Sequence, residues 1–222
     1  MRGVFVTGTD TGVGKTAVCA ALMARYRGAR YWKPIQTGAD DDTSEVLRLS
    51  SSPREAAYLH GVRLPDPVSP HLAAKRLGTR IDLPFLTAEI KKSGDCWIVE
   101  GAGGVLVPVN ESDLMVHLME RLGLPVVVVA RTTLGTINHA LLTIEALRAR
   151  RLAVAGVVMV GDFDPENRAA VERYGGVVVI GEMPWFEEEA GRRPAPHLDV
   201  QQLAGWAMEH LDTDNRLGEF LA

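Results

Sequence analysis

The chain has 222 residues, 46% of them hydrophobic, which suits one domain with a substantial core. A formal net charge of −4 and the lack of a basic run argue against a nucleic-acid partner, and the apolar stretches are too short to span a membrane. Met1-Arg2-Gly3 leads straight into the first expected strand, which leaves no room for a signal peptide. Cys19 and Cys96 are most simply buried residues of a reduced, cytoplasmic protein.

The first predicted element is a strand at Val4–Thr7, a β-branched and aromatic run. The glycine-rich stretch Gly8-Thr9-Asp10-Thr11-Gly12-Val13-Gly14-Lys15-Thr16 follows and leads into a helix at Ala17–Arg25, which contains no breakers. Strand, glycine-rich loop, Lys-Thr and helix together predict a phosphate-binding loop for a nucleoside triphosphate. In such a loop backbone N–H groups face the phosphates, Lys15 adds a full positive charge, and Thr16 places a hydroxyl beside a phosphate-bound Mg²⁺.

Two other interpretations of this stretch remain open. The general phosphate-loop pattern has glycine five residues before Gly14, where this chain has Thr9. A glycine turn with a chance lysine is therefore one alternative. The other is a dinucleotide fold, because the run from Gly12 to Ala17 also fits G-x-G-x-x-A. That fold requires an acidic residue about 20 residues later, where the chain has Lys33.

The rest of the chain alternates between predicted strands and predicted helices. The strands are expected at Tyr31–Trp32, Cys96–Val99, Val126–Ala130, Val154–Val160 and Val177–Ile180. The helices are expected from Asp40–Ser44 to Leu49 and at Pro53–Leu59, Asp82–Lys92, Asp113–Leu122, Leu134–Arg150, Pro165–Tyr174 and Asp199–His210, with a loop at Leu64–Pro70. This order predicts a single α/β domain over residues 1–222, a P-loop NTPase-like three-layer sandwich with a mainly parallel sheet covered on both faces.

Chemically distinctive residues follow several of the predicted strands. In parallel sheets ligands bind at the carboxyl ends of the strands, where this chain places the phosphate loop, Lys33 and Glu100. Glu100 precedes a glycine-rich turn that we expect to expose it, so that it could hold Mg²⁺ opposite Thr16. A helix-capping or surface glutamate is the alternative. Asp42 belongs to an acidic triplet of the kind that usually forms a solvated loop, so spacing alone does not single it out.

Together these residues resemble the dethiobiotin synthetase family. The resemblance includes the displaced first glycine of the loop and covers Val4 to Trp185 in family order. Its blocks are the loop itself, Lys33-Pro34-Ile35-Gln36-Thr37-Gly38, Ser69-Pro70-His71, Val99-Glu100-Gly101-Ala102-Gly103-Gly104, Leu134-Gly135-Thr136-Ile137-Asn138-His139 and Gly181-Glu182-Met183-Pro184-Trp185.

The resemblance implies an ATP- and Mg²⁺-dependent ligase of biotin synthesis. Its substrates would be 7,8-diaminononanoate, CO₂ and ATP, and its products dethiobiotin, ADP and phosphate. A carbamate forms on one amine, ATP phosphorylates it, and the neighbouring amine attacks the mixed anhydride. Carbamate and γ-phosphate are both anions, so Lys15, Lys33 and Mg²⁺ would offset their repulsion.

The resemblance also implies a set of site residues. Lys33 and Lys15 would be catalytic, and Thr16, Asp42 and Glu100 would hold the metal, with Asp40 and Asp41 leaving the register of the acidic ligand open. The nucleotide would contact Thr11, Gly12, Val13, Gly14, Lys15, Thr16, Ala17, Asp42, Glu100, Gly101, Ala102, Gly103, Pro184, Trp185 and Phe186. The diamine would contact Lys33 and Thr37, and its distal carboxylate would bind Leu134, Gly135, Ile137 and Asn138 of the opposite subunit in a homodimer.

Nucleotide choice is one point where the chain departs from the resemblance. Family members with strong adenine preference carry an asparagine after the strand that matches Val154–Val160, but this chain has Gly161-Asp162. We therefore expect weak discrimination among nucleobases. Two rival functions remain: a partitioning-type ATPase switch, which typically carries a lysine where Asp10 stands, and a related P-loop kinase or amidoligase.

Overall fold

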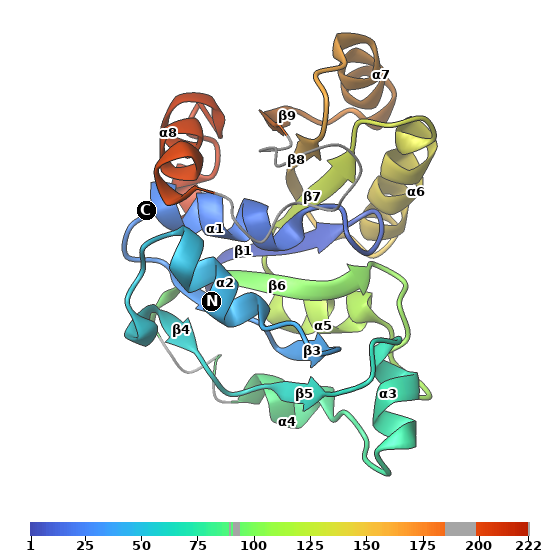
Figure 1. The fold of residues 1–222 in the computed structure, drawn as a ribbon. Coiled ribbons are helices and arrows are strands. Elements are labelled where there is room, and N and C mark those ends of the chain that lie inside the picture. The colour runs from blue at the N-terminus through green and yellow to red at the C-terminus, as the bar shows by residue number, and fades with distance from the viewer. Residues whose placement is uncertain (89, 91–93, 185–198, 222) are drawn as a thin grey trace.

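The structure, a computed structural model, describes residues 1–88, 90, 94–184 and 199–221. In this part of the chain the main feature is a parallel sheet of seven strands in the order β4-β2-β6-β1-β7-β8-β9 (Figure 1). The strands are β1 (Arg2–Gly8), β2 (Arg30–Trp32), β4 (Ala57–Tyr58), β6 (Cys96–Gly104), β7 (Val126–Arg131), β8 (Val154–Val160) and β9 (Val179–Met183). Because β1 lies in the middle of the sheet, the loop that follows it has strands on both sides.

Helices cover both faces of this sheet. One face packs against α1 (Lys15–Arg25), α2 (Asp42–Leu49), α8 (Val200–His210) and α9 (Gly218–Leu221). The other packs against α4 (Leu83–Ala88), α5 (Met115–Leu122), α6 (Thr136–Arg148) and α7 (Pro165–Gly175). A small parallel sheet of β3 (Ile35–Thr37) and β5 (Val62–Leu64) packs against α3 (Pro70–Arg76). The predicted three-layer α/β fold is confirmed.

Side chains that point alternately to the two faces of the sheet fill a hydrophobic core on each face. On β1, Val4 and Val6 belong to the core beneath α1, whereas Phe5 belongs to the core on the opposite face. A strand that is buried on both faces has no solvated side, which is why this run is almost wholly apolar. The carboxyl ends of these parallel strands meet at one edge of the sheet, so the residues that follow β1, β2 and β8 converge there.

The region between α2 and α3 differs from the sequence prediction. The helix expected at Pro53–Leu59 is wrong: a short 3₁₀ helix (Arg54–Ala56) leads directly into β4. Pairing of β4 with β2 holds the chain extended, and the Tyr58 ring packs edge-on against Trp32 and Trp97. The strands β3 and β5 were also missed, because three residues are too few for a period to be recognised.

The end of the chain docks on α1. The buried Asp212 accepts hydrogen bonds from the Tyr26 hydroxyl and from the backbone N–H groups of Arg216 and Leu217. Its own backbone N–H donates to the carbonyl of Ile180 on β9. This segment therefore joins the edge of the sheet to the first helix. No helix in the described part of the chain is long and apolar enough to cross a membrane.

Candidate active site

The phosphate loop joins β1 to α1 and has the backbone that its glycines predict. Gly14 is the N-cap of α1 in the left-handed conformation, with φ 96°. A Cβ atom there would lie 3.1 Å from the Val160 side chain, so glycine relieves both backbone strain and crowding. The buried Val13 anchors the loop to the core beneath α1. The N-terminal amides of α1 therefore point into the edge of the sheet where the strands end.

Lys15 lies within this loop and is almost fully buried. Its Nζ donates to the backbone carbonyl of Asp10 at 3.0 Å, which holds the side chain back over its own loop. Burial lowers the pKa of Lys15 below its ordinary value, and the nearby ammonium of Lys33 lowers the pKa further. The carboxylates of Glu100 and Asp42 act in the opposite direction and raise it, so the charges of the two lysines are partly offset by two carboxylates.

Lys33 forms the centre of the site, directly after β2. Its Nζ lies 2.6 Å from Oδ2 of Asp42 and 2.7 Å from Oε1 of Glu100, and it also donates to the carbonyl of Gly101 at 3.1 Å. Burial opposes the charge of Lys33, but the two carboxylates outweigh that effect and raise the pKa above its ordinary value. Lys33 is therefore a buried cation throughout the neutral pH range.

Glu100 is held differently from the prediction. The expected glycine-rich turn is wrong at this point, because β6 continues through Gly104 and places Glu100 inside the strand, with 1% of its surface exposed. Pairing of β6 with β1 makes Val6 the register partner of Glu100, and the register shifts only over the glycines that follow, where Gly103 has a φ of 67°. The Thr16 hydroxyl donates to Oε1 of Glu100 at 3.2 Å. Three of the predicted residues, Thr16, Lys33 and Glu100, thus come together.

The tertiary structure distinguishes the three aspartates of the acidic triplet. Asp41 is the N-cap of α2, where it accepts from the backbone and hydroxyl of Ser44, and it pairs with Arg63. Asp40 is exposed in the preceding loop. Asp42 lies in the first turn of α2 and reaches Lys33. Asp42 is therefore the member of the triplet that joins the site.

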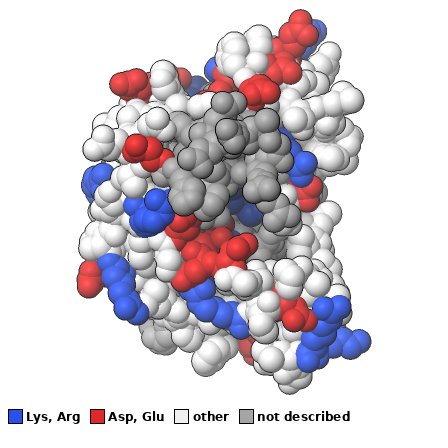
Figure 2. All heavy atoms as spheres, viewed as in Figure 1, with Lys and Arg blue, Asp and Glu red and all other residues white. Residues whose placement is uncertain are grey.

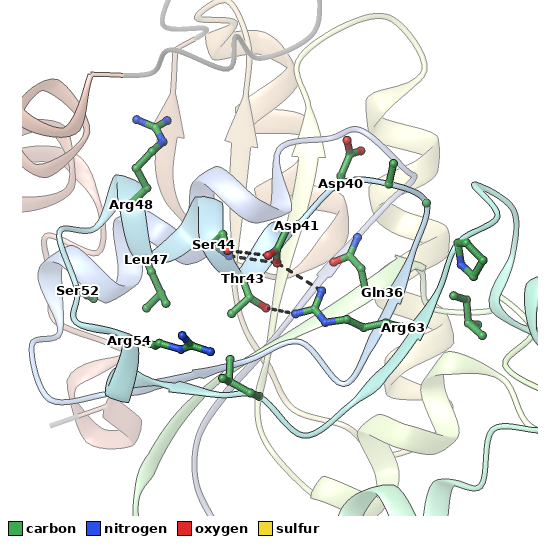
Figure 3. Close-up of a pocket in the computed structure, with 15 residues that line it drawn as sticks. Gln36, Asp40, Asp41, Thr43, Ser44, Leu47, Arg48, Ser52, Arg54 and Arg63 are labelled. Carbon is green, nitrogen blue, oxygen red and sulfur yellow. Dashed lines mark hydrogen bonds and ion pairs between the residues drawn. The ribbon is translucent and has the colours of Figure 1, made fainter.

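Figure 3 shows that Asp41 lines a cavity next to the cluster around Lys33. A cavity of about 910 Å³ lies beside α2, and Arg63 of β5 extends across it toward Asp41 and Thr43. Asp41 therefore belongs to this neighbouring cavity rather than to the cluster around Lys33. On the face viewed in Figure 2, acidic side chains gather in the middle, and lysine and arginine side chains lie beside them.

The donor atoms around Lys33 fit Mg²⁺. A threonine hydroxyl and two carboxylates supply hard oxygen ligands, and Mg²⁺ typically combines one or two carboxylates with water and phosphate oxygens. The described residues contain no group of three or more His, Cys, Asp or Glu side chains placed to bind a metal by themselves. A Mg²⁺ ion held by these three residues would complete its coordination with water and phosphate oxygens.

Comparison with known proteins places this site in a family. A family profile described as an AAA domain matches residues 2–191. The ATP-dependent dethiobiotin synthetase BioD of Paramagnetospirillum magneticum is 51% identical over 209 residues, which cover 92% of this chain and 94% of that protein. The enzyme of the same name from a Bradyrhizobium species is 42% identical, covering 85% of this chain and 90% of that protein. The chain belongs to the ATP-dependent dethiobiotin synthetase family.

Membership in the dethiobiotin synthetase family confirms the predicted enzyme class, an ATP-dependent ligase that forms C–N bonds, with ATP as co-substrate. The structure of a ParA family ATPase from Chlorobium tepidum has a TM-score of 0.56 at 11% identity, covering 94% of this chain and all of that one. At that identity the likeness shows the fold alone. It therefore does not favour the partitioning-type switch.

The segment that the dethiobiotin synthetase resemblance assigns to the distal carboxylate lies apart from Lys33. Gly135 is the N-cap of α6, with φ 95° and no side-chain cap, and Leu134 and Asn138 are exposed while Ile137 is half-buried. Among the described residues no hydrogen bond or ion pair joins this segment to Lys33. Thr37 ends β3 and is half-buried. Lys33 follows β2 and α6 follows β7, and these two strands are separated in the sheet by β6 and β1.

The segments to which the resemblance assigns the nucleobase are described in part. Gly161 follows β8 and donates its N–H to the carbonyl of Met183 at 2.9 Å, and Pro184 is exposed beyond β9. Gly161 and Pro184 both line a hollow of about 530 Å³ at the ends of β8 and β9. The predicted contacts Trp185 and Phe186 lie outside the described residues.

Sequence reasoning missed two residues at the site. Arg131, which ends β7, pairs with Asp10 at 2.6 Å and so braces the phosphate loop from the other side. Tyr31 of β2 donates its hydroxyl to Oε2 of Glu100 at 2.8 Å. The only available signal for Arg131 was its place at a strand end, and for Tyr31 it was a polar atom in an otherwise apolar strand.

Proposed function

We propose that this protein carboxylates 7,8-diaminononanoate with CO₂ and closes the ring to dethiobiotin, consuming ATP in the presence of Mg²⁺. One observation carries the proposal: Lys33, a buried cation, lies between two carboxylates directly beside the phosphate loop. The reaction must bring a carbamate and a triphosphate, both anionic, to one place. Family membership with enzymes named ATP-dependent dethiobiotin synthetase supports this choice of substrates.

In this proposal the loop binds the triphosphate. Backbone N–H groups at the start of α1 and the Nζ of Lys15 hold the phosphate oxygens. Thr16, Asp42 and Glu100 would hold Mg²⁺, which when bound neutralises part of the triphosphate charge. The contact between Thr16 and Glu100 supports their assignment to one ligand set. Thr11, Val13, Ala17 and Gly101 to Gly103 surround the phosphates.

Lys33 would act on the carbamate as an electrostatic group. The carbamate oxygen attacks the γ-phosphorus of ATP and the bond to ADP breaks, which gives a carbamic-phosphoric mixed anhydride. The second amine then attacks the carbonyl carbon, loses a proton, and expels phosphate as the ring closes. A permanently protonated Lys33 stabilises the negative charge on the carbamate oxygen and on the phosphate oxygen during these steps. Because its pKa is raised, we assign it no role as a base.

We also propose that the active unit is a cytoplasmic homodimer of single-domain subunits. The N-terminus of α6, with Leu134, Gly135, Ile137 and Asn138, would bind the distal carboxylate of a substrate whose amines lie at Lys33 and Thr37 of the other subunit. Free N–H groups at a helix start suit a carboxylate. The exposure of this segment, apart from Lys33 of the same chain, supports the shared arrangement.

The direct test is incubation with ATP, bicarbonate and the diamine, followed by measurement of phosphate and identification of dethiobiotin by mass spectrometry. We expect phosphate release that requires the diamine and equals the amount of ring product. A partitioning-type switch would release phosphate without the diamine. A kinase or amidoligase would give a phosphorylated or amidated product instead, and either result would contradict the proposal.

A further inference from the structure

Tyr31 and Glu100 lie on the same face of two neighbouring strands. The register of β2 with β6 pairs Tyr31 with Ile98, and Glu100 lies two residues further along β6. Side chains two residues apart on a strand share one face, so Glu100 and Ile98 both face α1. The long side chain of Tyr31 crosses this diagonal, and its hydroxyl reaches Glu100 at 2.8 Å.

The two oxygens of Glu100 have different partners. Oε1 accepts from Thr16 at 3.2 Å and from Lys33 at 2.7 Å, both at the edge where the phosphate loop lies. Oε2 accepts from Tyr31, which is fully buried. Inside the fold the carboxylate is held by the Tyr31 hydroxyl, with the Cys19 thiol as a further, weaker hydrogen-bond partner, and Oε1 is presented toward the loop.

Resting on the proposed role of Glu100 as a metal ligand, we infer that Tyr31 is a positioning residue that orients this carboxylate for Mg²⁺-nucleotide. A buried carboxylate on a strand has freedom about its terminal torsion, and a hydrogen bond to one oxygen fixes the plane of the group. Outer-shell partners of this kind change metal affinity by roughly 10–100-fold when they are removed. Tyr31 itself touches neither substrate nor metal in this role.

The alternative is that the Tyr31 hydroxyl only stabilises the fold. Its ring belongs to the core beneath α1, together with Cys19 and Ile98, and that packing would survive replacement by phenylalanine. Burial, followed by the charge of Glu100, raises the pKa of Tyr31, so the hydroxyl is a neutral donor at working pH. The two roles therefore differ in the effect of removing the Tyr31 hydroxyl. A structural role affects only the stability of the fold, whereas a positioning role also affects metal binding.

The test measures Mn²⁺ binding to the ADP complex of the full chain, from the electron paramagnetic resonance signal of free Mn²⁺. The variants are Tyr31→Phe, Glu100→Gln and the double variant. Tyr26→Phe is a matched control, because it also removes a buried hydroxyl that donates to a carboxylate, at the far end of α1. We expect Tyr31→Phe to weaken Mn²⁺ binding by about tenfold or more, and Tyr26→Phe to leave it unchanged.

The double variant distinguishes an action through Glu100 from an independent one. If Tyr31 works by orienting Glu100, the double variant binds Mn²⁺ no more weakly than Glu100→Gln alone, because the two losses are not additive. Additive losses would overturn the inference, as would wild-type Mn²⁺ affinity in Tyr31→Phe or failure of that variant to fold. If Glu100→Gln itself binds Mn²⁺ normally, the proposed metal role of Glu100 fails instead.

Discussion

At the scale of single residues, the site depends on one cation between two carboxylates. Lys33 and Glu100 have only 4% and 1% of their side-chain surfaces exposed, so neither charge can be satisfied by water. Breaking such a pair leaves an uncompensated charge in the interior, which typically costs about 3–5 kcal/mol. The same burial makes the pair a sensitive point for both stability and chemistry.

We expect Lys33→Ala to lower turnover by about 10²–10³-fold, because it removes a cation that stabilises charge in the transition state. It should also lower the melting temperature, since Glu100 loses its partner. Steady-state phosphate release measures the first effect and thermal unfolding the second. Lys75→Ala, which removes an exposed lysine from α3, is the control and should change neither. Near-wild-type turnover in Lys33→Ala would contradict the proposed role.

At the scale of elements, we expect the ends of β8 and β9 to decide how the nucleobase is recognised. The residue after β8 is Gly161, whose N–H is already engaged by the carbonyl of Met183 and which has no side chain to pair with a base. Asp162 is exposed beside it and could accept from an exocyclic amine. A site discriminates strongly when a wrong base leaves one of its buried polar groups without a hydrogen-bond partner. A site that has no such group discriminates weakly.

We therefore expect ATP to be preferred by less than about a hundredfold, which corresponds to roughly 2.7 kcal/mol, over the best competing nucleotide. Turnover with ATP, CTP, GTP and UTP at equal Mg²⁺ and limiting nucleotide measures the preference. Asp162→Ala should reduce any advantage of ATP and CTP, whose bases carry an exocyclic amine, over UTP. A larger preference for ATP over all three nucleotides would show that the missing asparagine does not matter.

At the scale of the whole molecule, distant parts of the chain complete each other. The C-terminal segment closes on α1 through Tyr26 and Asp212, which lie 186 residues apart in the sequence. Lys33 and the start of α6, which we propose as two halves of a substrate site, follow strands that β6 and β1 separate in the sheet. The contact of Tyr26 with Asp212 concerns the stability of the fold. The positions of Lys33 and the start of α6 concern the proposed assembly of two subunits.

The Tyr26 contact predicts a pH dependence of stability. Burial, followed by the hydrogen bond to Asp212, raises the pKa of Tyr26 from 10.0 to about 12. The folded state thus holds this proton more tightly than the unfolded state, so the stabilisation is complete below pH 10 and is lost as the pH rises toward 12. The melting temperature of the wild type should fall more steeply over this range than that of Tyr26→Phe, and parallel curves would contradict the assignment.

The proposed cross-subunit site predicts complementation between inactive subunits. Asn138→Asp should repel the substrate carboxylate, and Lys33→Ala should disable the other half of the site. In a twofold dimer with random exchange, half the dimers are hybrids and each hybrid has one intact site, so roughly a quarter of wild-type activity should return. Size-exclusion chromatography and a tagged subunit establish the exchange. If exchange is shown and no activity returns, the cross-subunit arrangement is wrong.

Local patterns were enough to predict the class of fold, the phosphate loop and the family. Strand and helix periods, the spacing of glycines around Lys15, and the alternation of elements are all properties of neighbouring residues. The same patterns also placed Lys33 correctly at the end of a strand. Local patterns did not predict the three-residue strands. They also predicted a helix at Pro53–Leu59 where the structure has β4, because β4 exists only through its pairing with β2.

Only the tertiary structure decided which side chains meet. Asp41 and Asp42 are adjacent and chemically identical, yet the cap of α2 uses one and Lys33 attracts the other. The burial of Glu100 and its contact with Tyr31 follow from the register of β6 against its neighbours on both sides. Register is set by packing over the whole sheet, because a shift of one residue would turn every side chain to the opposite face. No stretch of sequence carries that information alone.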